Sequence, residues 1–353
     1  MKLNTRPTEE LWQTILQACR EATSTILFEQ YLVENDVISH ELAAVLIERA
    51  KAGVEVKCLF DAIGSFYLGR SHLPQEMIAA GVQLEFFNWL RPYSPKSQKL
   101  LYFRNHRRIL IIDGKKAFTG SICFADHTKP WREAVLEIDE PAIITKMKEV
   151  FMMDWYRARQ RKFKLRRKAP EGADGFYFVT SDPLPRRRFL YYRLIEAIRQ
   201  AKTSVYLLTP YFLPDSRLLR VLKLAVRRGV DVRVLIPASS NHRIVDLGAE
   251  TYFEDVLMAG IKIFRHQFIV HAKTTVIDDD WATVGSLNLD NISLRYNFEA
   301  NVVATDPHFV ADVKKHFFDN IADSKELLME EWRNRSYWRQ FQEMLVWPIR
   351  KLL

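Results

Sequence analysis

Hydrophobic and polar positions along the chain alternate between two periods. Apolar residues recur at helical spacing over Glu9–Glu21, and the following run, Ser24–Leu32, has the composition of a buried strand. Further helices are expected over Glu41–Ala52 and Gln75–Ala80, each followed by a glycine, with a strand over Val54–Phe60. Helices that alternate with apolar strands predict a layered α/β domain with a largely parallel sheet.

The second part of the chain repeats this order of elements. The expected elements are a helix over 190–200, a strand over 205–208, a helix over 217–228, a strand over 232–236 and a helix over 253–259. Gly53 in AKAGVEVK matches Gly229 in VRRGVDVR, and Gly81 matches Gly260. This agreement indicates an internal duplication.

Two polar stretches inside apolar surroundings carry the clearest repeat. Segment 268–290 reads FIVHAKTTVIDDDWATVGSLNLD, and segment 105–123 reads NHRRILIIDGKKAFTGSIC. The shared positions are His271, Lys273, Asp278, Gly285 and Ser286 in one copy and His106, Arg108, Asp113, Gly120 and Ser121 in the other. Residues two apart in an extended chain share a face, so each histidine and its cation can contact one anion. The two aspartates stand at an odd separation from the histidines, which predicts a structural role for them.

The pattern H-x-K-x4-D-x6-G-S-x-N, present twice, resembles the phospholipase D superfamily. The second copy matches at every position, whereas the first has Arg108 and Cys123 where lysine and asparagine are usual. The resemblance implies an α/β fold of two duplicated α/β/α sandwich halves, related by a pseudo-two-fold axis, with one active site at their interface. It also implies a phosphohistidine on one ring and proton donation by the other. We predict that His106 is the nucleophile and His271 the acid, although near symmetry leaves the reverse assignment open.

The resemblance assigns roles to other matched residues. These are Lys273 and Arg108 for the phosphate oxygens, and Ser121, Ser286 and Asn288 for hydrogen bonds to the phosphate or to neighbouring groups. Glu133 lies 27 residues after His106, and Glu299 lies 28 residues after His271. In the family an acidic residue at this place bonds its histidine, so we expect each glutamate to orient the histidine of its own copy. No metal ion and no cofactor is expected.

Length and composition agree with two halves and a tail. We divide the 353 residues into a first half (1–156), a basic linker (157–188), a second half (189–320) and an amphipathic, Trp-rich C-terminal tail (321–353). Three cysteines without metal-ligand spacing argue against a disulfide scaffold or a zinc site. The first residues do not resemble a signal peptide, and no run of 18 apolar residues occurs. We therefore expect a cytoplasmic protein, peripheral on the cell membrane.

Three segments have more than one interpretation. Of the net charge of +9, eight positive charges fall between Arg157 and Lys168, either as a solvated linker or as a contact for anionic lipid or nucleic acid. An insertion in the first half, residues 91–104, either shapes substrate access or is a neutral loop. In the tail, apolar residues at helical intervals either pack on their own domain or lie in a bilayer interface. These residues are Trp338, Phe341, Leu345, Ile349 and Leu352.

Segment 209–215, TPYFLPD, also resembles the corresponding part of bacterial cardiolipin synthases. The expected function is a phosphatidyltransferase of that type, with phosphatidylglycerol as a phospholipid substrate and an anionic membrane surface as partner. The alternatives are a hydrolase of the phospholipase D type, a nuclease, or a non-catalytic lipid-binding relative. A nucleic-acid partner is not expected, because neither a DNA-binding module nor a series of stacking aromatic residues is present. His271→Ala is expected to abolish turnover, and Arg108→Lys to retain or raise it.

Overall fold

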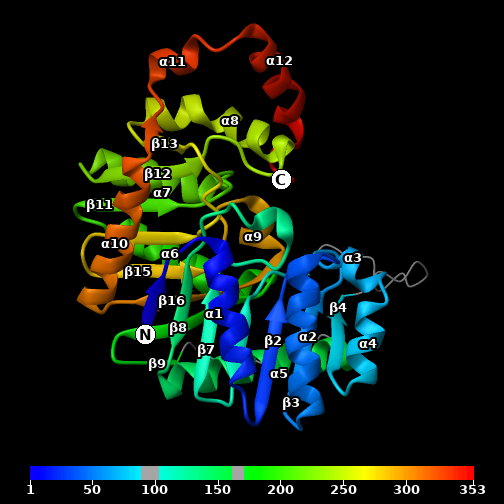
Figure 1. The fold of residues 1–353 in the computed structure, drawn as a ribbon. Helices are drawn as coiled ribbons and strands as arrows, with labels where there is room; N and C mark the ends of the chain where they lie inside the picture. Colours follow the sequence, from blue (N-terminus) through cyan, green and yellow to red (C-terminus); the bar gives the residue numbers. More distant parts are fainter. Residues whose placement is uncertain (89–102, 161–170) are drawn as a thin grey trace.

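Two mixed β-sheets form the centre of the molecule, and helices cover them (Figure 1). The computed structural model describes residues 1–88, 103–160 and 171–353. The predicted insertion 91–104, except for Phe103 and Arg104, and the basic residues of 161–168 lie outside these ranges.

The first sheet has the strand order β1-β8-β7-β6-β2-β3-β4. Its strands are β1 (Lys2–Asn4), β2 (Thr25–Gln30), β3 (Glu55–Asp61), β4 (Gln83–Phe87), β6 (Ile109–Ile112), β7 (Lys116–Gly120) and β8 (Val135–Ile138). The helices of this half are α1 (Thr8–Arg20), α2 (Val37–Lys51), α3 (Phe66–Gly69), α4 (Leu73–Ala79) and α5 (Pro141–Gln160). Only β2, β3 and β4 run parallel, whereas β6, β7, β8 and β1 pair antiparallel. The prediction of a largely parallel sheet was wrong, because the motif forms tight hairpins that add antiparallel strands.

The second sheet follows the order β17-β13-β12-β11-β14-β15-β16-β10-β9, and β5 also pairs with β16. Its strands are β5 (Arg104–Asn105), β9 (Glu171–Ala173), β10 (Phe176–Ser181), β11 (Ser204–Leu208), β12 (Asp231–Pro237), β13 (Lys262–His266), β14 (Thr274–Ile277), β15 (Trp281–Gly285), β16 (Asn297–Ala304) and β17 (Ser324–Glu326). The helices are α6 (Phe189–Gln200), α7 (Ser216–Arg227), α8 (Arg243–Met258), α9 (Asn291–Arg295) and α10 (Pro307–Ala322). The order β16-β15-β14-β11-β12-β13 reproduces β8-β7-β6-β2-β3-β4 of the first sheet, so the predicted duplication is confirmed.

Helix α8 begins ten residues before the predicted helix over 253–259. Its first part was missed because Gly248 interrupts the hydrophobic period. A Cβ atom at Gly248 would come within 2.9 Å of the side chains of both Leu213 and Leu353. The glycine therefore allows the C-terminal residues to pack closely on α8.

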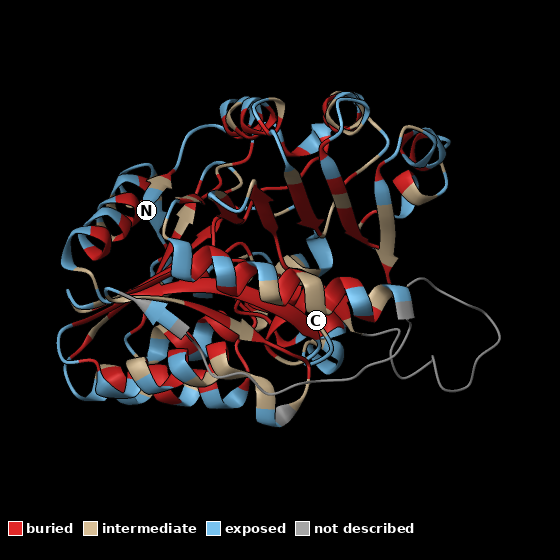
Figure 2. Ribbon diagram, turned by 90° about the horizontal axis from the view of Figure 1, so that it is seen from below, coloured by how far each residue is buried: buried red, intermediate tan, exposed pale blue. Residues whose placement is uncertain are grey.

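The two halves meet along a core that lies between the sheets. Helices α5 and α10 both contribute to this core, together with strands from each sheet. Within the described residues, hydrogen-bonded backbone joins the halves at two places, where β5 runs parallel to β16 and where Arg132 forms a bridge with Val270. Figure 2 shows the buried strands at the centre and the exposed faces of the helices outside. The two motifs thus come together at the junction of the halves.

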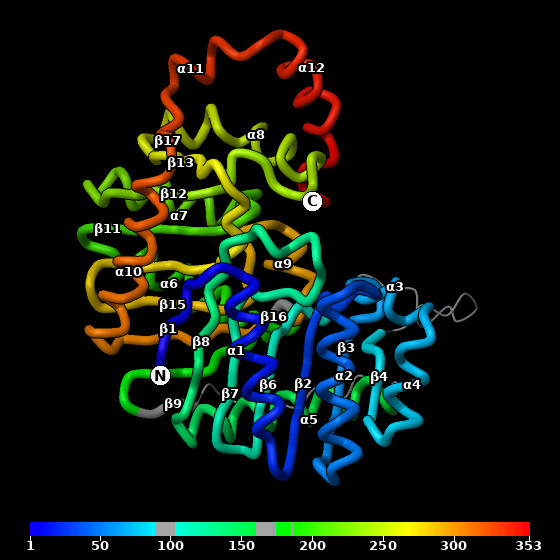
Figure 3. Tube along the Cα trace, in the orientation of Figure 1, coloured from blue at the N-terminus to red at the C-terminus, as the bar shows by residue number. Residues whose placement is uncertain are grey.

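The tail continues beyond α10 as an arch over α8 that contains α11 (Met329–Arg333) and α12 (Tyr337–Val346) (Figure 3). Arg339 binds the buried Glu250 of α8 through two contacts of 2.6 Å, and Val346 is buried. The opposite side of α12 stays exposed, with Trp338 and Leu345 at 65% and 60% of their full accessibility. A different face therefore packs on the protein, whereas the apolar residues Trp338, Phe341, Leu345, Ile349 and Leu352 stay exposed, so the interpretation that they pack on their own domain was wrong. No helix in the described ranges combines the length and hydropathy of a membrane span.

Candidate active site

The two predicted histidines lie at the junction of the halves, each just before a motif strand. The backbone N–H of His106 donates to Phe298 at 3.0 Å, and that of His271 donates to Arg132 at 2.8 Å. Both acceptors belong to the opposite half of the chain. Each histidine is therefore held by backbone of the other half, and both side chains are buried.

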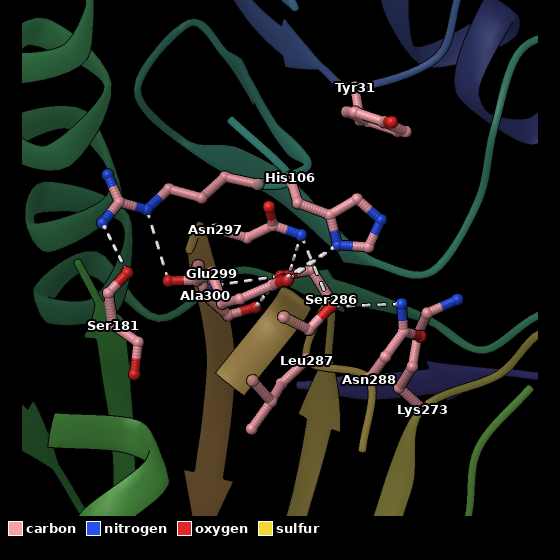
Figure 4. A network of polar contacts seen from close by, with 12 residues as sticks. Tyr31, His106, Ser181, Lys273, Ser286, Leu287, Asn288, Asn297, Glu299 and Ala300 are labelled. Carbon is pink, nitrogen blue, oxygen red and sulfur yellow. Dashed lines mark hydrogen bonds and ion pairs between the residues drawn. The ribbon is translucent and has the colours of Figure 1, made fainter. Parts of the chain in front are cut away.

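The glutamates are exchanged between the halves, contrary to the expectation that each would orient the histidine of its own copy. Nδ1 of His106 lies 2.9 and 3.0 Å from the two carboxylate oxygens of Glu299 (Figure 4). Nδ1 of His271 lies 2.8 Å from Oε1 of Glu133. Glu133 follows Arg132 and Glu299 follows Phe298, and the carbonyls of these two preceding residues accept from the histidines. Each glutamate side chain therefore reaches the histidine ring of the other half. In its ionised form each glutamate keeps the proton on Nδ1 and leaves Nε2 for chemistry.

The predicted serines lie behind these glutamates. Ser286 Oγ donates to Glu299 at 2.5 Å and accepts from the N–H of Ala300 at 2.9 Å (Figure 4). Ser121 Oγ accepts from the N–H of Ala134 at 2.9 Å. Each hydroxyl therefore fastens a motif turn to the strand region that carries a glutamate.

Asn288 and Cys123 occupy equivalent positions and have different surroundings. Asn288 Nδ2 donates to Ser293 Oγ at 3.3 Å, while its buried Oδ1 has no hydrogen-bond partner among the described residues. The Cys123 thiol lies 3.4 Å from Nη2 of Arg108. The asparagine thus retains a free acceptor, whereas the thiol contacts the cation of its own motif.

The two cations differ in how firmly they are held. Arg108 donates from Nε to Ile122 O at 2.9 Å and from Nη1 to His106 O at 3.0 Å, and its Nη2 lies 3.3 Å from Nε2 of His106. Lys273 donates to His271 O at 2.6 Å. Burial, with Arg108 nearby, lowers the pKa of Lys273 to about 7.

Burial and the two cations also set the protonation of the histidines and glutamates. The pKa values of His106 and His271 lie well below their usual range, first because of burial and then because of Arg108 and Lys273. Burial raises the pKa of Glu133 to about 7 and that of Glu299 to about 8. In the ligand-free protein the imidazoles are therefore neutral at pH 7, and the site favours an anionic ligand.

The two motif aspartates lie away from the histidines, in the tight turns after β6 and β14. Asp113, at φ 53°, accepts from the backbone N–H groups of Thr23, Ser24 and Thr25 at 2.7 to 2.9 Å. Asp278, at φ 52°, binds the N–H groups of residues 202–204 in the same way. Although burial opposes it, these N–H groups hold the pKa of both carboxyls below the usual range. Each aspartate ties a motif hairpin to the start of the neighbouring strand.

Sequence reasoning missed two aromatic residues that contact the histidines. The Tyr31 ring lies 4.8 Å from the ring of His106, and the Trp131 ring lies 4.7 Å from that of His271. Trp131 stands two residues before Glu133, as Asn297 stands two residues before Glu299. An aromatic residue close to a predicted glutamate was the available signal for Trp131; nothing in the sequence pointed to Tyr31.

A buried ionic cluster beside the site was also missed. Arg107, between the two motif residues, is fully buried and binds Asp154 of α5 and, at 2.6 Å, Asp182. Arg157 binds Asp154 as well and is buried. One interpretation placed Arg157 in a solvated basic linker and the other in a contact for anionic lipid or nucleic acid, and both were wrong for this residue because α5 turns it towards the acids. The available signal was a difference between the two copies, because the second copy has Ala272 at the position equivalent to Arg107. An arginine that occurs in one copy alone indicates a partner that occurs in that half alone.

Within the described residues, one group has the spacing of a metal site. Ligand atoms of Cys123, Glu133 and His271 lie within 4.8 Å of one another. Glu133 already binds Nδ1 of His271, and Arg108 and Lys273 place two positive charges beside the group. Repulsion from these charges makes the group unfavourable for a metal ion.

Comparison with known proteins agrees with this geometry. The family described as "Cardiolipin synthase, PLD-like domain" matches residues 15–155 and 194–321. The chain belongs to this family. Cardiolipin synthase A of Pseudomonas entomophila (strain L48) is 32% identical over 336 residues, which cover 92% of this chain and 69% of the relative. Cardiolipin synthase 2 of Bacillus anthracis is 31% identical over 349 residues, 95% of this chain and 67% of the relative. The predicted membership of the phospholipase D superfamily is confirmed.

Solved structures support the fold of this family member. The phosphatidylserine synthase of Haemophilus influenzae Rd KW20 superposes with a TM-score of 0.71 at 12% identity, covering 99% of this chain and 91% of that one. A polyphosphate kinase from Porphyromonas gingivalis gives a TM-score of 0.65 at 12% identity, over 97% of this chain and 53% of the kinase. The predicted pair of α/β halves is confirmed.

Proposed function

We propose that this chain is a phosphatidyltransferase of the cardiolipin synthase type, which moves a phosphatidyl group through a phosphohistidine to an alcohol such as the glycerol hydroxyl of phosphatidylglycerol. Family membership supports the reaction class. The observation that carries the mechanism is the crossed pairing of His106 with Glu299 and of His271 with Glu133. It directs Nε2 of each ring, rather than Nδ1, to the reacting phosphorus.

In the first step, Nε2 of His106 attacks phosphorus and the bond to the donor's glycerol oxygen breaks. His106 is suited to this role because its lowered pKa keeps the ring neutral. Arg108 and Lys273 hold the non-bridging oxygens and stabilise the charge that develops there. The bound phosphodiester adds negative charge beside His271, which raises the pKa of that ring and lets it give a proton to the leaving alkoxide.

In the second step the same groups act in reverse. The acceptor hydroxyl gives its proton to His271 and attacks phosphorus, and the bond from phosphorus to Nε2 of His106 breaks. Water in place of the alcohol would produce hydrolysis, so exclusion of water decides between a transferase and a phospholipase.

We place the reaction at an anionic membrane surface, with the uncovered face of α12 as one contact. Tyr337, Trp338 and Leu345 are exposed along it, and Trp347 follows the helix. Tryptophan beside arginine suits a helix lying at the headgroup boundary. Trp338→Ser combined with Phe341→Ser is expected to weaken vesicle binding about tenfold, as lost apolar burial predicts, when measured by co-flotation.

Turnover of phosphatidylglycerol in mixed micelles, beside single-stranded DNA, tests the reaction. We expect cardiolipin and glycerol as products, and His271→Ala is expected to lower turnover by at least about 10³-fold because it removes the acid. His308→Ala, on the exposed part of α10, is the matched control and is expected to be unaffected. Phosphatidic acid as the product would indicate hydrolysis, and DNA cleavage would indicate a nuclease.

The same variants distinguish the two histidines. With a donor that carries an acidic leaving group, His271→Ala is expected to accumulate a phosphatidyl adduct on His106, detectable by mass spectrometry, because such a group leaves without an acid. His106→Ala is expected to form none. An adduct on His271 would reverse the assignment, and full activity of His271→Ala would remove the mechanism.

A further inference from the structure

A groove between α6 and α7 carries five arginines and lies outside the histidine site. It has a volume of about 590 Å³, and its arginines are Arg199, Arg217, Arg220, Arg227 and Arg228. Ile195, Val221 and Leu224 complete the lining, which includes no carboxylate among the described residues. The groove shares none of its lining with the catalytic residues proposed above.

These arginines lack acidic partners. In the described part of the chain no ion pair joins Arg199, Arg220 or Arg227 to a carboxylate, and all three are exposed. Arg228 donates to the carbonyls of Ile198 and Ala201, which orients it without neutralising it. Positive charges gathered in one groove repel one another, and an anion would relieve that repulsion.

The duplication provides an internal reference for this groove. Helices α1 and α2 are the equivalents of α6 and α7, and Arg20 and Arg199 each lie five residues before the next strand. Arg20 is paired with Glu41 of α2 at 3.4 Å.

The acid that neutralises the first-half arginine is replaced by arginine in the second half. Counted from the N-cap residues Asp36 and Asp215, the equivalent of Glu41 is Arg220. Helix α7 is three residues shorter than α2, so a count from the other end gives a different residue. Counted back from Gly53 and Gly229, which follow the two helices, the equivalent of Glu41 is Arg217. Either count places an arginine where the first half has a glutamate. The excess charge is therefore specific to the second half and does not follow from the fold.

We propose that the α6–α7 groove binds the phosphate of an anionic phospholipid headgroup, as a second lipid site separate from the substrate at the histidines. Guanidinium groups bind phosphate oxygens in pairs, and five of them exceed what one phosphodiester needs. The apolar part of the lining favours a lipid over a nucleic acid, because the exposed Leu224 offers contact to glycerol and acyl carbons, and among the described residues no aromatic side chain lines the groove for base stacking.

The test is co-sedimentation of the full chain with vesicles of phosphatidylcholine alone or mixed with phosphatidylglycerol. Arg220→Glu with Arg227→Glu restores acid to the groove, as in the first half. Lys51→Glu with Lys148→Glu makes the same change of charge on the exposed parts of α2 and α5 and is the matched control. Circular dichroism melting verifies that both variants fold, and the binding assay does not depend on turnover.

We expect the groove variant to bind the mixed vesicles roughly 30-fold more weakly than the unaltered chain, since each cation near an anionic surface contributes about one fivefold step. The control variant is also expected to bind more weakly, but the logarithm of its loss in affinity is expected to be less than about a third of that of the groove variant. Equal losses in both variants would overturn the proposal, because they would indicate only net charge.

Two further arms separate the sources of phosphate. Inorganic phosphate is added at the same ionic strength as a chloride control, and it is expected not to release the chain from the vesicles. Release by phosphate would indicate a site for free anions and would overturn the lipid assignment. A single-stranded oligonucleotide is expected to bind both variants equally. Loss of oligonucleotide binding with unchanged vesicle binding would assign the groove to nucleic acid and likewise overturn the proposal.

Discussion

The surroundings of His106 and His271 share one plan and differ in rigidity. Both rings bind a glutamate of the other half through Nδ1, but Glu299 uses both oxygens and is itself fixed by Ser286, whereas Glu133 uses one. The other oxygen of Glu133 has no hydrogen-bond partner among the described residues. The surroundings of His106 are therefore the more firmly constrained.

The cations extend this difference. Arg108 is anchored to two carbonyls and keeps its charge at any accessible pH, whereas Lys273 has a pKa of about 7 and makes one hydrogen bond to the described part of the chain. A fixed partner suits a nucleophile that must attack at one angle, and an adjustable environment suits a ring that takes up and gives back a proton. The duplication kept the framework while the two sites diverged in charge and anchoring.

Replacing each glutamate tests the difference most strongly. Glu299→Gln is expected to lower kcat about 10²-fold, because an amide on Nδ1 favours the wrong tautomer of His106. Glu133→Gln is expected to lower kcat about tenfold, since one hydrogen bond is affected. Steady-state kinetics would measure both, and Glu299→Asp is expected to recover part of the loss. A larger loss in Glu133→Gln than in Glu299→Gln would contradict the ranking of the two sites.

The charge of Lys273 predicts a pH dependence. As pH rises through about 7, Lys273 loses its proton and with it the attraction for the phosphate, so kcat/KM falls by about tenfold between pH 7 and pH 9. Lys273→Arg keeps the charge and is expected to move this alkaline limb up by more than one unit.

Glu133 and Glu299 also titrate in this range, but the loss of their protons gives the carboxylates that orient the histidines and therefore raises activity with pH. Their titration persists in Lys273→Arg. An alkaline limb that does not move in this variant would therefore contradict its assignment to Lys273.

The duplication determines which site residues could be predicted from the sequence. Matched offsets identified both histidines, both glutamates and the motif aspartates, because equal spacing in two copies distinguishes these residues from ordinary surface charges. The exchange of Glu133 and Glu299 between halves could not be predicted, since spacing along the chain says nothing about which strand crosses the junction. Tyr31 contacts His106 from a position where the second copy, counted from the N-cap residues Asp36 and Asp215, has Pro210, so matched offsets did not identify it.

Arg108 and Cys123 give the last and smallest test of the comparison, and here the structure changes the expectation drawn from the sequence. Arg108→Lys was expected to retain or raise activity, but a lysine cannot reach Ile122 O, His106 O and the Cys123 thiol together as the guanidinium does. We now expect the single variant to lose about fivefold in kcat/KM, the cost of about one hydrogen bond left unmade.

Adding Cys123→Asn to Arg108→Lys reproduces the lysine and asparagine of the second half, and we expect it to recover most of that loss. The measurement is a double-mutant cycle in kcat/KM, in which Cys123→Asn alone is expected to change activity less than about twofold. A cycle without coupling would show that Arg108 acts on the substrate independently of Cys123. Coupling between the two substitutions would mean that Arg108 and Cys123 replace the lysine and asparagine of the second motif as a pair. The guanidinium nitrogens of Arg108 would then fill the space that the asparagine side chain occupies beside a lysine.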